Sequence, residues 1–190
     1  MKRSDKLEKR KRRNTILIGI IVVAVMVGGM FFVPFGQENK QEELKYNGYQ
    51  FALTQYGFAV DVNGQTFYFS NFPKELENIT NITTNEQFVF THDKIYFARN
   101  ESELKDDRNV KSVVFQLYRD RIFQDATYDP LDTRDVPLVS CDENRDIVML
   151  KIGENKIYKD KNCLVIEGKD YNEITKLAEY LLYRTIGIMS

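Results

Sequence analysis

The sequence predicts an α+β domain that follows a single N-terminal transmembrane helix. Three observations lead to this prediction. An uncharged apolar run occupies residues 15–35, short strand-like segments recur from residue 49 onward, and two separated segments have the apolar spacing of amphipathic helices. The strands are expected to form an antiparallel sheet with both main helices on one face.

The apolar run is long enough to cross a bilayer. Thr15–Phe35 has 21 residues and no charge, and as a helix it would extend about 31 Å at 1.5 Å per residue. The hydrocarbon core of a bilayer is about 30 Å thick. We therefore assign residues 15–36 to a transmembrane helix whose partner is the lipid bilayer. A cleaved signal peptide is the alternative, but its apolar region is shorter and ends in small residues, whereas this run ends in FFVPF.

The flanking charges predict the orientation of this segment. Residues 1–14 carry eight Lys or Arg and two Asp or Glu, a net charge of +6. Because the whole chain carries −1, the remaining residues sum to −7. The positive-inside rule places the basic tail in the cytoplasm and the rest of the chain outside it. An acidic body of this kind is not expected to bind nucleic acid.

Residues 37–45, directly after the predicted membrane helix, are predicted to form a short polar linker. The rest of the chain, residues 46–190, is predicted to form a folded body. The best hairpin signal is Asn63-Gly64, between runs of alternating aromatic and polar residues. The predicted strands cover residues 49–54, 58–62, 65–69, 87–90, 94–98, 136–140, 146–152, 156–158 and 163–167.

Helical signals occur at three places in the body. A short helix is predicted over residues 72–79, where Pro73 stands at its start. A longer amphipathic helix is predicted from Val110 to Phe123, followed by a loop over residues 124–135. The last helix is predicted to run from Asp170 to Ile186, with Asp170 and Glu173 forming a capping box.

Cys141 and Cys163 are the two cysteines of the chain. In an oxidising compartment outside the cytoplasm they are expected to pair as a disulfide. The bridge would close a loop of about twenty residues and contribute roughly 3 kcal/mol. Two free thiols remain the main alternative. A redox pair and a zinc site are less consistent with the sequence, because there is no Cys-x-x-Cys motif and a single histidine.

The sequence shows no catalytic, cofactor-binding or metal-binding motif, so we predict no catalytic residue, no cofactor site and no metal site. His92 is the single histidine and lies between two predicted strands, where a surface turn is expected. Asp142, Glu143 and Asp146 follow Cys141 and are interpreted as a solvated acidic turn. A pocket with two facing carboxylates, or His92 beside one, would favour an enzyme.

Three Asn-x-Ser/Thr triplets lie on the predicted outer side of the membrane. They begin at Asn78, Asn81 and Asn100. In a host that has N-glycosylation, these asparagines are candidate acceptors.

Several short motifs, most of them in the last fifty residues, are similar to those of small membrane-anchored proteins from uncharacterised archaeal lineages. The motifs are Cys141-Asp142, KIGENKIY from Lys151, NCLVIEG from Asn162 and IGIM from Ile186, with NGQTFYF and FPKELENI nearer the N-terminus. These proteins have no assigned activity. The resemblance implies a surface-exposed Cys-containing α+β domain and makes N-glycosylation more plausible.

Together, these features predict a membrane-anchored module of the cell envelope that binds or organises another surface protein or polymer. An anchored carboxylate-based hydrolase that acts on envelope polymers is the alternative. A third hypothesis is a role in folding or assembling exported proteins. An enzymatic role is the less favoured of these, because no catalytic constellation is evident in the sequence.

Overall fold

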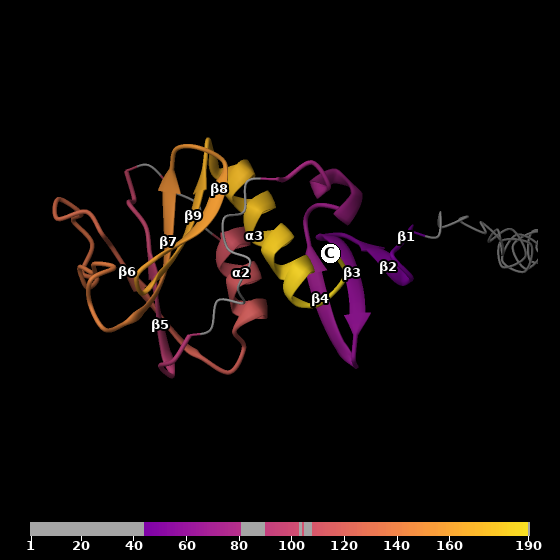
Figure 1. Ribbon diagram of the computed structural model, residues 1–190, viewed down its shortest axis with the longest axis horizontal. Helices are drawn as coiled ribbons and strands as arrows, with labels where there is room; N and C mark the ends of the chain where they lie inside the picture. The colour runs from indigo at the N-terminus through magenta and orange to yellow at the C-terminus, as the bar shows by residue number, and fades with distance from the viewer. Residues whose placement is uncertain (1–43, 81–89, 103, 105–107, 190) are drawn as a thin grey trace, which may run out of the picture. The chain divides into compact units, whose positions relative to one another are not determined.

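The computed structural model describes residues 44–80, 90–102, 104 and 108–189 (Figure 1). The predicted basic tail, the predicted transmembrane segment (15–36) and most of the predicted linker lie outside these residues. Within the described part of the chain, no helix combines the length and the apolarity needed to cross a membrane. Glu43–Ser190 forms one compact unit, and the fold described below is that of this body.

The first sheet is antiparallel, as predicted, with the strand order β1-β2-β3-β4. Its strands are β1 (Leu44–Tyr46), β2 (Tyr49–Thr54), β3 (Gly57–Val62) and β4 (Gln65–Phe69). Val62 pairs with Gln65, and Asn63 and Gly64 have φ values of 53° and 79°. The predicted Asn-Gly hairpin is therefore confirmed, because both of its turn residues adopt positive φ. Leu44 and Lys45, which were predicted to belong to the linker, are part of β1.

The second sheet has five strands in the order β6-β5-β7-β9-β8. They are β5 (Lys94–Ala98), β6 (Ile122–Ala126), β7 (Asp146–Ile152), β8 (Lys156–Asp160) and β9 (Cys163–Gly168). β6, β5, β7 and β9 are joined in parallel, and β8 alone is antiparallel to its neighbour. The predicted antiparallel arrangement is wrong for this sheet, because residue alternation identifies strands but not their partners.

Two main helices, α2 (Arg108–Leu117) and α3 (Tyr171–Thr185), lie between the sheets (Figure 1). They cover one face of the five-stranded sheet, as predicted. The main core is shared by both sheets and both helices, and Phe51, Phe97, Val113 and Leu182 are among its buried members. The short η1 (Pro73–Leu76) contacts α3 and is a single 3-10 turn where a helix over residues 72–79 was predicted.

α3 confirms most of the features predicted for it. Asp170 caps it by accepting the N–H of Glu173 at 2.9 Å. The second half of the predicted capping box is absent, since the Glu173 carboxylate instead accepts from Asn155 and Lys176. The helix ends at Thr185, one residue before the predicted end at Ile186, and Gly187 follows with φ of 81°.

The second predicted helix is corrected at its C-terminal end. It stops at Leu117, and Ile122 and Phe123 belong to β6, which pairs in parallel with β5. A short apolar run has no periodicity that separates a helix turn from a strand. The result is a β5–α2–β6 unit, in which the helix provides the crossover that parallel neighbours require.

Two further predicted strands have different outcomes. Residues 136–140 form no strand and contribute one isolated bridge, between Thr127 and Leu138. Pro137, which has no N–H to donate to a ladder, lies in this segment. The predicted strand over residues 87–90 lies outside the described residues except for Phe90, which is buried.

Candidate functional site

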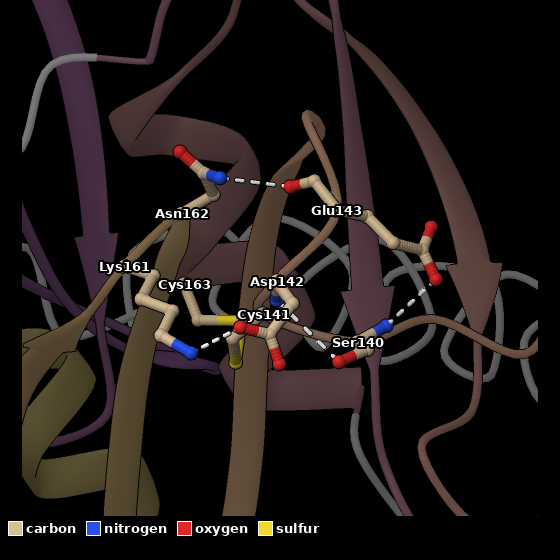
Figure 2. The surroundings of a disulfide bond; sticks show 7 residues. All are labelled: Ser140, Cys141, Asp142, Glu143, Lys161, Asn162 and Cys163. Atoms are coloured by element: carbon tan, nitrogen blue, oxygen red, sulfur yellow. Dashed lines mark hydrogen bonds and ion pairs between the residues drawn. A yellow bond between two sulfur atoms is a disulfide. The ribbon is translucent and has the colours of Figure 1, made fainter.

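The disulfide predicted from the sequence is present between Cys141 and Cys163 (Figure 2). The two Cα atoms are 5.2 Å apart. Cys163 is fully buried at the start of β9, whereas Cys141 is half-buried in the long loop between β6 and β7. Since both sulfurs are bonded to each other, neither is available as a thiolate for a metal or for nucleophilic chemistry.

The bridge attaches this loop to the second face of the five-stranded sheet. That face has its own small core, in which Ile147, Met149 and Val165 are buried. Two hydrogen bonds from Asn162 reinforce the attachment. Its backbone N–H donates to the Cys141 carbonyl at 3.3 Å, and its side-chain Nδ2 donates to the Glu143 carbonyl at 2.8 Å. The loop therefore covers the sheet face that neither helix covers.

The three carboxylates that follow Cys141 do not converge on one point. Asp142 pairs with Lys161 beside the bridge (Figure 2), and this lysine lowers the pKa of the Asp142 carboxyl. Glu143 pairs with Arg145 and accepts the N–H of Ser140. The prediction of an acidic turn is thus correct for Asp142 and Glu143, whereas Asp146 is buried at the start of β7.

His92 lies in the turn before β5, as predicted, and the structure places it beside Asp146. One Asp146 oxygen accepts the backbone N–H of His92 at 2.5 Å, and the other is 3.3 Å from His92 Nδ1. Thr91 Oγ1 lies 3.2 Å from the same ring nitrogen. These contacts join the N-terminal ends of β5 and β7, so the carboxylate stabilises the turn. No local signal in the sequence indicates this contact, since 54 residues separate its two members.

The candidate glycosylation sites differ in their surroundings. Asn78 is exposed directly after η1, and Thr80 of its triplet is exposed as well. Asn100 is half-buried, and its Oδ1 accepts from the N–H of Ser102 at 2.9 Å and from its hydroxyl at 2.7 Å. Asn81 lies outside the described residues. Asn78 is therefore the more accessible acceptor of the two that can be compared.

A basic groove along the exposed face of α2 was not predicted. It has a volume of about 440 Å3. Its lining combines three basic residues with polar and aromatic ones: Arg108, Lys111, Ser112, Phe115, Gln116 and Arg119. The signal in the sequence was the spacing of Arg108, Lys111 and Phe115, which places them on one side of α2, and Arg119 follows in the turn after this helix. The prediction of this helix used only its apolar side.

Two basic groups of the groove, those of Lys111 and Arg119, are held in defined positions. Lys111 Nζ pairs with Asp125. The Arg119 guanidinium donates to the Thr66 carbonyl at 2.8 Å and lies 4.9 Å from the centre of the Phe67 ring. No carboxylate of the described residues pairs with Arg119, so its charge is not neutralised by this part of the chain. The groove is consequently suited to a ligand that brings negative charge.

Phe115 and Gln116, which also line the groove, are fixed as well. Phe115 remains 40% exposed and packs edge-on against Phe123 of β6, with ring centres 4.3 Å apart. Gln116 donates to the Tyr68 carbonyl at 3.0 Å and accepts its N–H at 2.7 Å. This amide occupies the free edge of β4 in the way a further strand would, and it fixes α2 against the first sheet.

A second hollow, of about 570 Å3, lies between η1, the β7–β8 turn and the start of α3. Three carboxylate residues line it: Glu75, Glu154 and Glu173. Lys176 donates to Glu173 at 2.8 Å, and Asn155 donates to the other oxygen at 2.7 Å. The hollow also includes Asn78 of the first glycosylation triplet.

Comparison with protein-family models, with characterised proteins and with solved structures finds no match to this chain. The function is therefore inferred from the sequence and the geometry alone.

Proposed function

We propose that this chain is a membrane-anchored module whose disulfide-braced body lies outside the cytoplasm and binds a negatively charged component of the cell envelope through the α2 groove. The observation that carries the binding role is the groove itself. It presents Arg108, Lys111 and Arg119 around an exposed aromatic ring, in a chain whose residues after position 14 sum to −7.

The proposed location rests on two independent features. The uncharged run over residues 15–35 and the basic residues before it favour an anchor with its N-terminus in the cytoplasm. The Cys141–Cys163 bridge favours an oxidising compartment for the body. A body in a reducing cytoplasm would agree with neither feature.

The basic groups favour a negatively charged partner over a neutral one. No carboxylate among the described residues pairs with the Arg119 guanidinium, and Thr66 and Phe67 already hold it in position, which favours the binding of an anion. Phe115 adds apolar and aromatic contact area in the middle of the same surface. A partner with carboxylate or phosphate groups next to an apolar part fits this combination.

Crosslinking in native membranes tests the proposal. A photoreactive amino acid in place of Ser112, which lines the groove, is expected to capture a specific envelope component that mass spectrometry can identify. Arg119→Gln and Lys111→Gln should each reduce the yield, because they remove charge and retain a polar side chain. The matched control is the same amino acid in place of Asn172, which is exposed on α3.

Two results would contradict the binding role. One is an adduct of equal yield from position 172. The other is a position 112 adduct whose yield neither charge substitution changes. If position 112 instead crosslinks to many exported proteins of unrelated sequence, the result would support the hypothesis of a role in their folding or assembly.

The alternative function, an anchored carboxylate-based hydrolase, is favoured by Glu75 and Glu173 lining one hollow and by His92 lying beside Asp146. Neither His92 nor Asp146 lines any of the hollows described above. The test is release of soluble fragments from isolated envelope polymer by the full chain. Activity that Glu75→Gln and Glu173→Gln abolish, while His92→Gln has no effect, would place a hydrolase in the hollow. No release above that of a heat-denatured sample would reject it.

A further inference from the structure

The β2–β3 hairpin ends in an exposed apolar tip. Leu53 is 63% exposed and Tyr56 is 79% exposed. The eleven residues Gln50–Val60 include no charged side chain, although 29% of the whole chain is charged. An exposed leucine alone needs no explanation, but here it stands beside an exposed tyrosine on a surface segment from which charge is absent.

The tip has a fixed shape. Thr54 Oγ1 donates to the Gly57 carbonyl at 3.0 Å and accepts the Tyr56 N–H at 3.2 Å. Gly57 has φ of 119°, and a side chain there would overlap the Phe69 carbonyl oxygen. The turn therefore presents Tyr56 and Leu53 in a defined arrangement, so little conformational freedom would be lost on docking.

The strand register places this tip at the end of the sheet where the chain enters it. β1 is antiparallel to β2, and Leu44 is opposite Phe51. The start of β1 therefore faces the β2–β3 turn, and the opposite end of the sheet carries the Asn47-Gly48 and Asn63-Gly64 turns. Thr54 lies three residues beyond Phe51, so the tip extends about 10 Å past the entry point at 3.4 Å per residue.

The length of chain before β1 limits how far this end can lie from the predicted anchor. Seven residues, 37–43, separate the predicted transmembrane segment from Leu44. Fully extended, they span at most about 25 Å. An uncharged tip that extends about 10 Å from the entry point is therefore within reach of the membrane surface. Tyrosine and leucine are side chains that the interfacial region accepts, tyrosine with its ring buried and its hydroxyl hydrated.

We propose that the β2–β3 tip, with Leu53 and Tyr56, docks into the interfacial region of the lipid bilayer and orients the body on the membrane. This inference rests on the proposed anchor. It identifies the bilayer as a second contact of the chain, made by the body itself. The α2 groove is formed by other residues and stays available to the envelope component.

The chain has no tryptophan, so one introduced tryptophan is a unique reporter. The full chain with Tyr56→Trp is reconstituted into phosphatidylcholine vesicles that contain brominated lipid. We expect the emission of the tryptophan introduced at position 56 to be blue-shifted and to lose intensity by bromine quenching. Leu131→Trp is the matched control, because Leu131 is 85% exposed in the β6–β7 loop, and its emission should stay unquenched. Leu53→Trp provides a second probe of the tip if the first variant does not fold.

The outcomes separate this inference from the anchor. If the chain stays with the vesicles in alkaline carbonate but neither tip tryptophan is quenched, the docking inference is wrong and the anchor stands. A blue shift without quenching would show that the tip packs against protein, such as a second copy, and would also overturn the inference. If carbonate extracts the chain, both the anchor and the docking fail.

Discussion

The buried side chain of Glu179 connects α3 to the first sheet. It lies on α3 and is 1% exposed. Its carboxylate accepts the N–H groups of Ser70 and Asn71 at 2.5 and 2.9 Å, and the Asn71 side chain at 2.8 Å. Burial raises the pKa of this carboxyl, while the three donors favour its charged form. The carboxylate thus ends β4 and fixes the first sheet to the helix layer.

We expect Glu179→Gln to destabilise the body by about 1–3 kcal/mol, because an amide NH2 group cannot accept from buried N–H donors. Urea unfolding of the purified chain, followed by circular dichroism, measures the change. Asp120→Asn, at an exposed position on the turn after α2, is the control and should change the midpoint little. Equal midpoints for both variants would show that the Glu179 contacts do not contribute to stability.

The Asp132 side chain makes a pH-dependent contribution to the stability of the folded body. Its side chain is 2% exposed and pairs with the Arg134 guanidinium at 2.6 Å. Hydrogen bonds from Arg134 hold the pKa of Asp132 well below its usual range. Because the folded-state pKa is depressed, the stabilisation is present above the unfolded-state pKa of about 3.9 and is lost as the pH falls through the folded-state pKa.

The full chain is therefore expected to lose stability on acidification below about pH 4. Asp132→Asn should lose less over the same range, since it has no carboxylate to protonate. Unfolding midpoints measured at a series of pH values test this. A variant that shows the same acid slope as the parent would contradict the assignment to Asp132.

Gly57 fixes the hairpin tip through its backbone. Alanine there would combine an unfavourable positive φ with an overlap between its Cβ and the Phe69 carbonyl oxygen. We expect Gly57→Ala to lower the unfolding free energy clearly more than Gly48→Ala, which also has positive φ but no atom within 4 Å of the added carbon. A loss in Gly57→Ala no greater than the loss in Gly48→Ala would show that the close approach is not a constraint.

At the level of elements, the Cys141–Cys163 disulfide is expected to stabilise the folded body. The bridge joins residues 22 positions apart, and removing it leaves the segment between them, which contains β7 and β8, unconstrained in the unfolded state. The double variant Cys141→Ala/Cys163→Ala is expected to lose roughly 3 kcal/mol. Unfolding with and without reductant tests this, since reductant should destabilise the parent and have no effect on the double variant. A parent that is equally stable in reductant would contradict a stabilising role.

Sequence patterns were sufficient for elements whose signals are local. The Asn63-Gly64 hairpin, the cap of α3 by Asp170 and the buried side of α3 follow from neighbouring residues. β6 was missed because Ile122–Ala126 is too short to show a period, and the parallel pairing that depends on it was missed as well. The contact between His92 and Asp146 was missed since it depends on how distant segments pack. The α2 groove, whose lining comes from one local segment, was missed because the prediction of this helix used only its apolar side.

At the scale of the whole molecule, one distribution of charge and apolarity explains the proposed arrangement. The basic residues are concentrated in positions 1–14, the uncharged run follows, and the body after it is acidic. Within the body, the exposed basic groove and the uncharged hairpin tip are separate surfaces on α2 and on the first sheet. We therefore assign one surface to an envelope partner and another to the lipid.

The central claim is that the body lies outside the cytoplasm, attached through the segment at residues 15–36. Protease treatment of intact cells, followed by mass spectrometry of the remaining peptides, tests it most directly. We expect peptides from residues 37–190 to disappear while those from residues 1–14 are retained. Protection of the body in intact cells, with cleavage only after lysis, would contradict it.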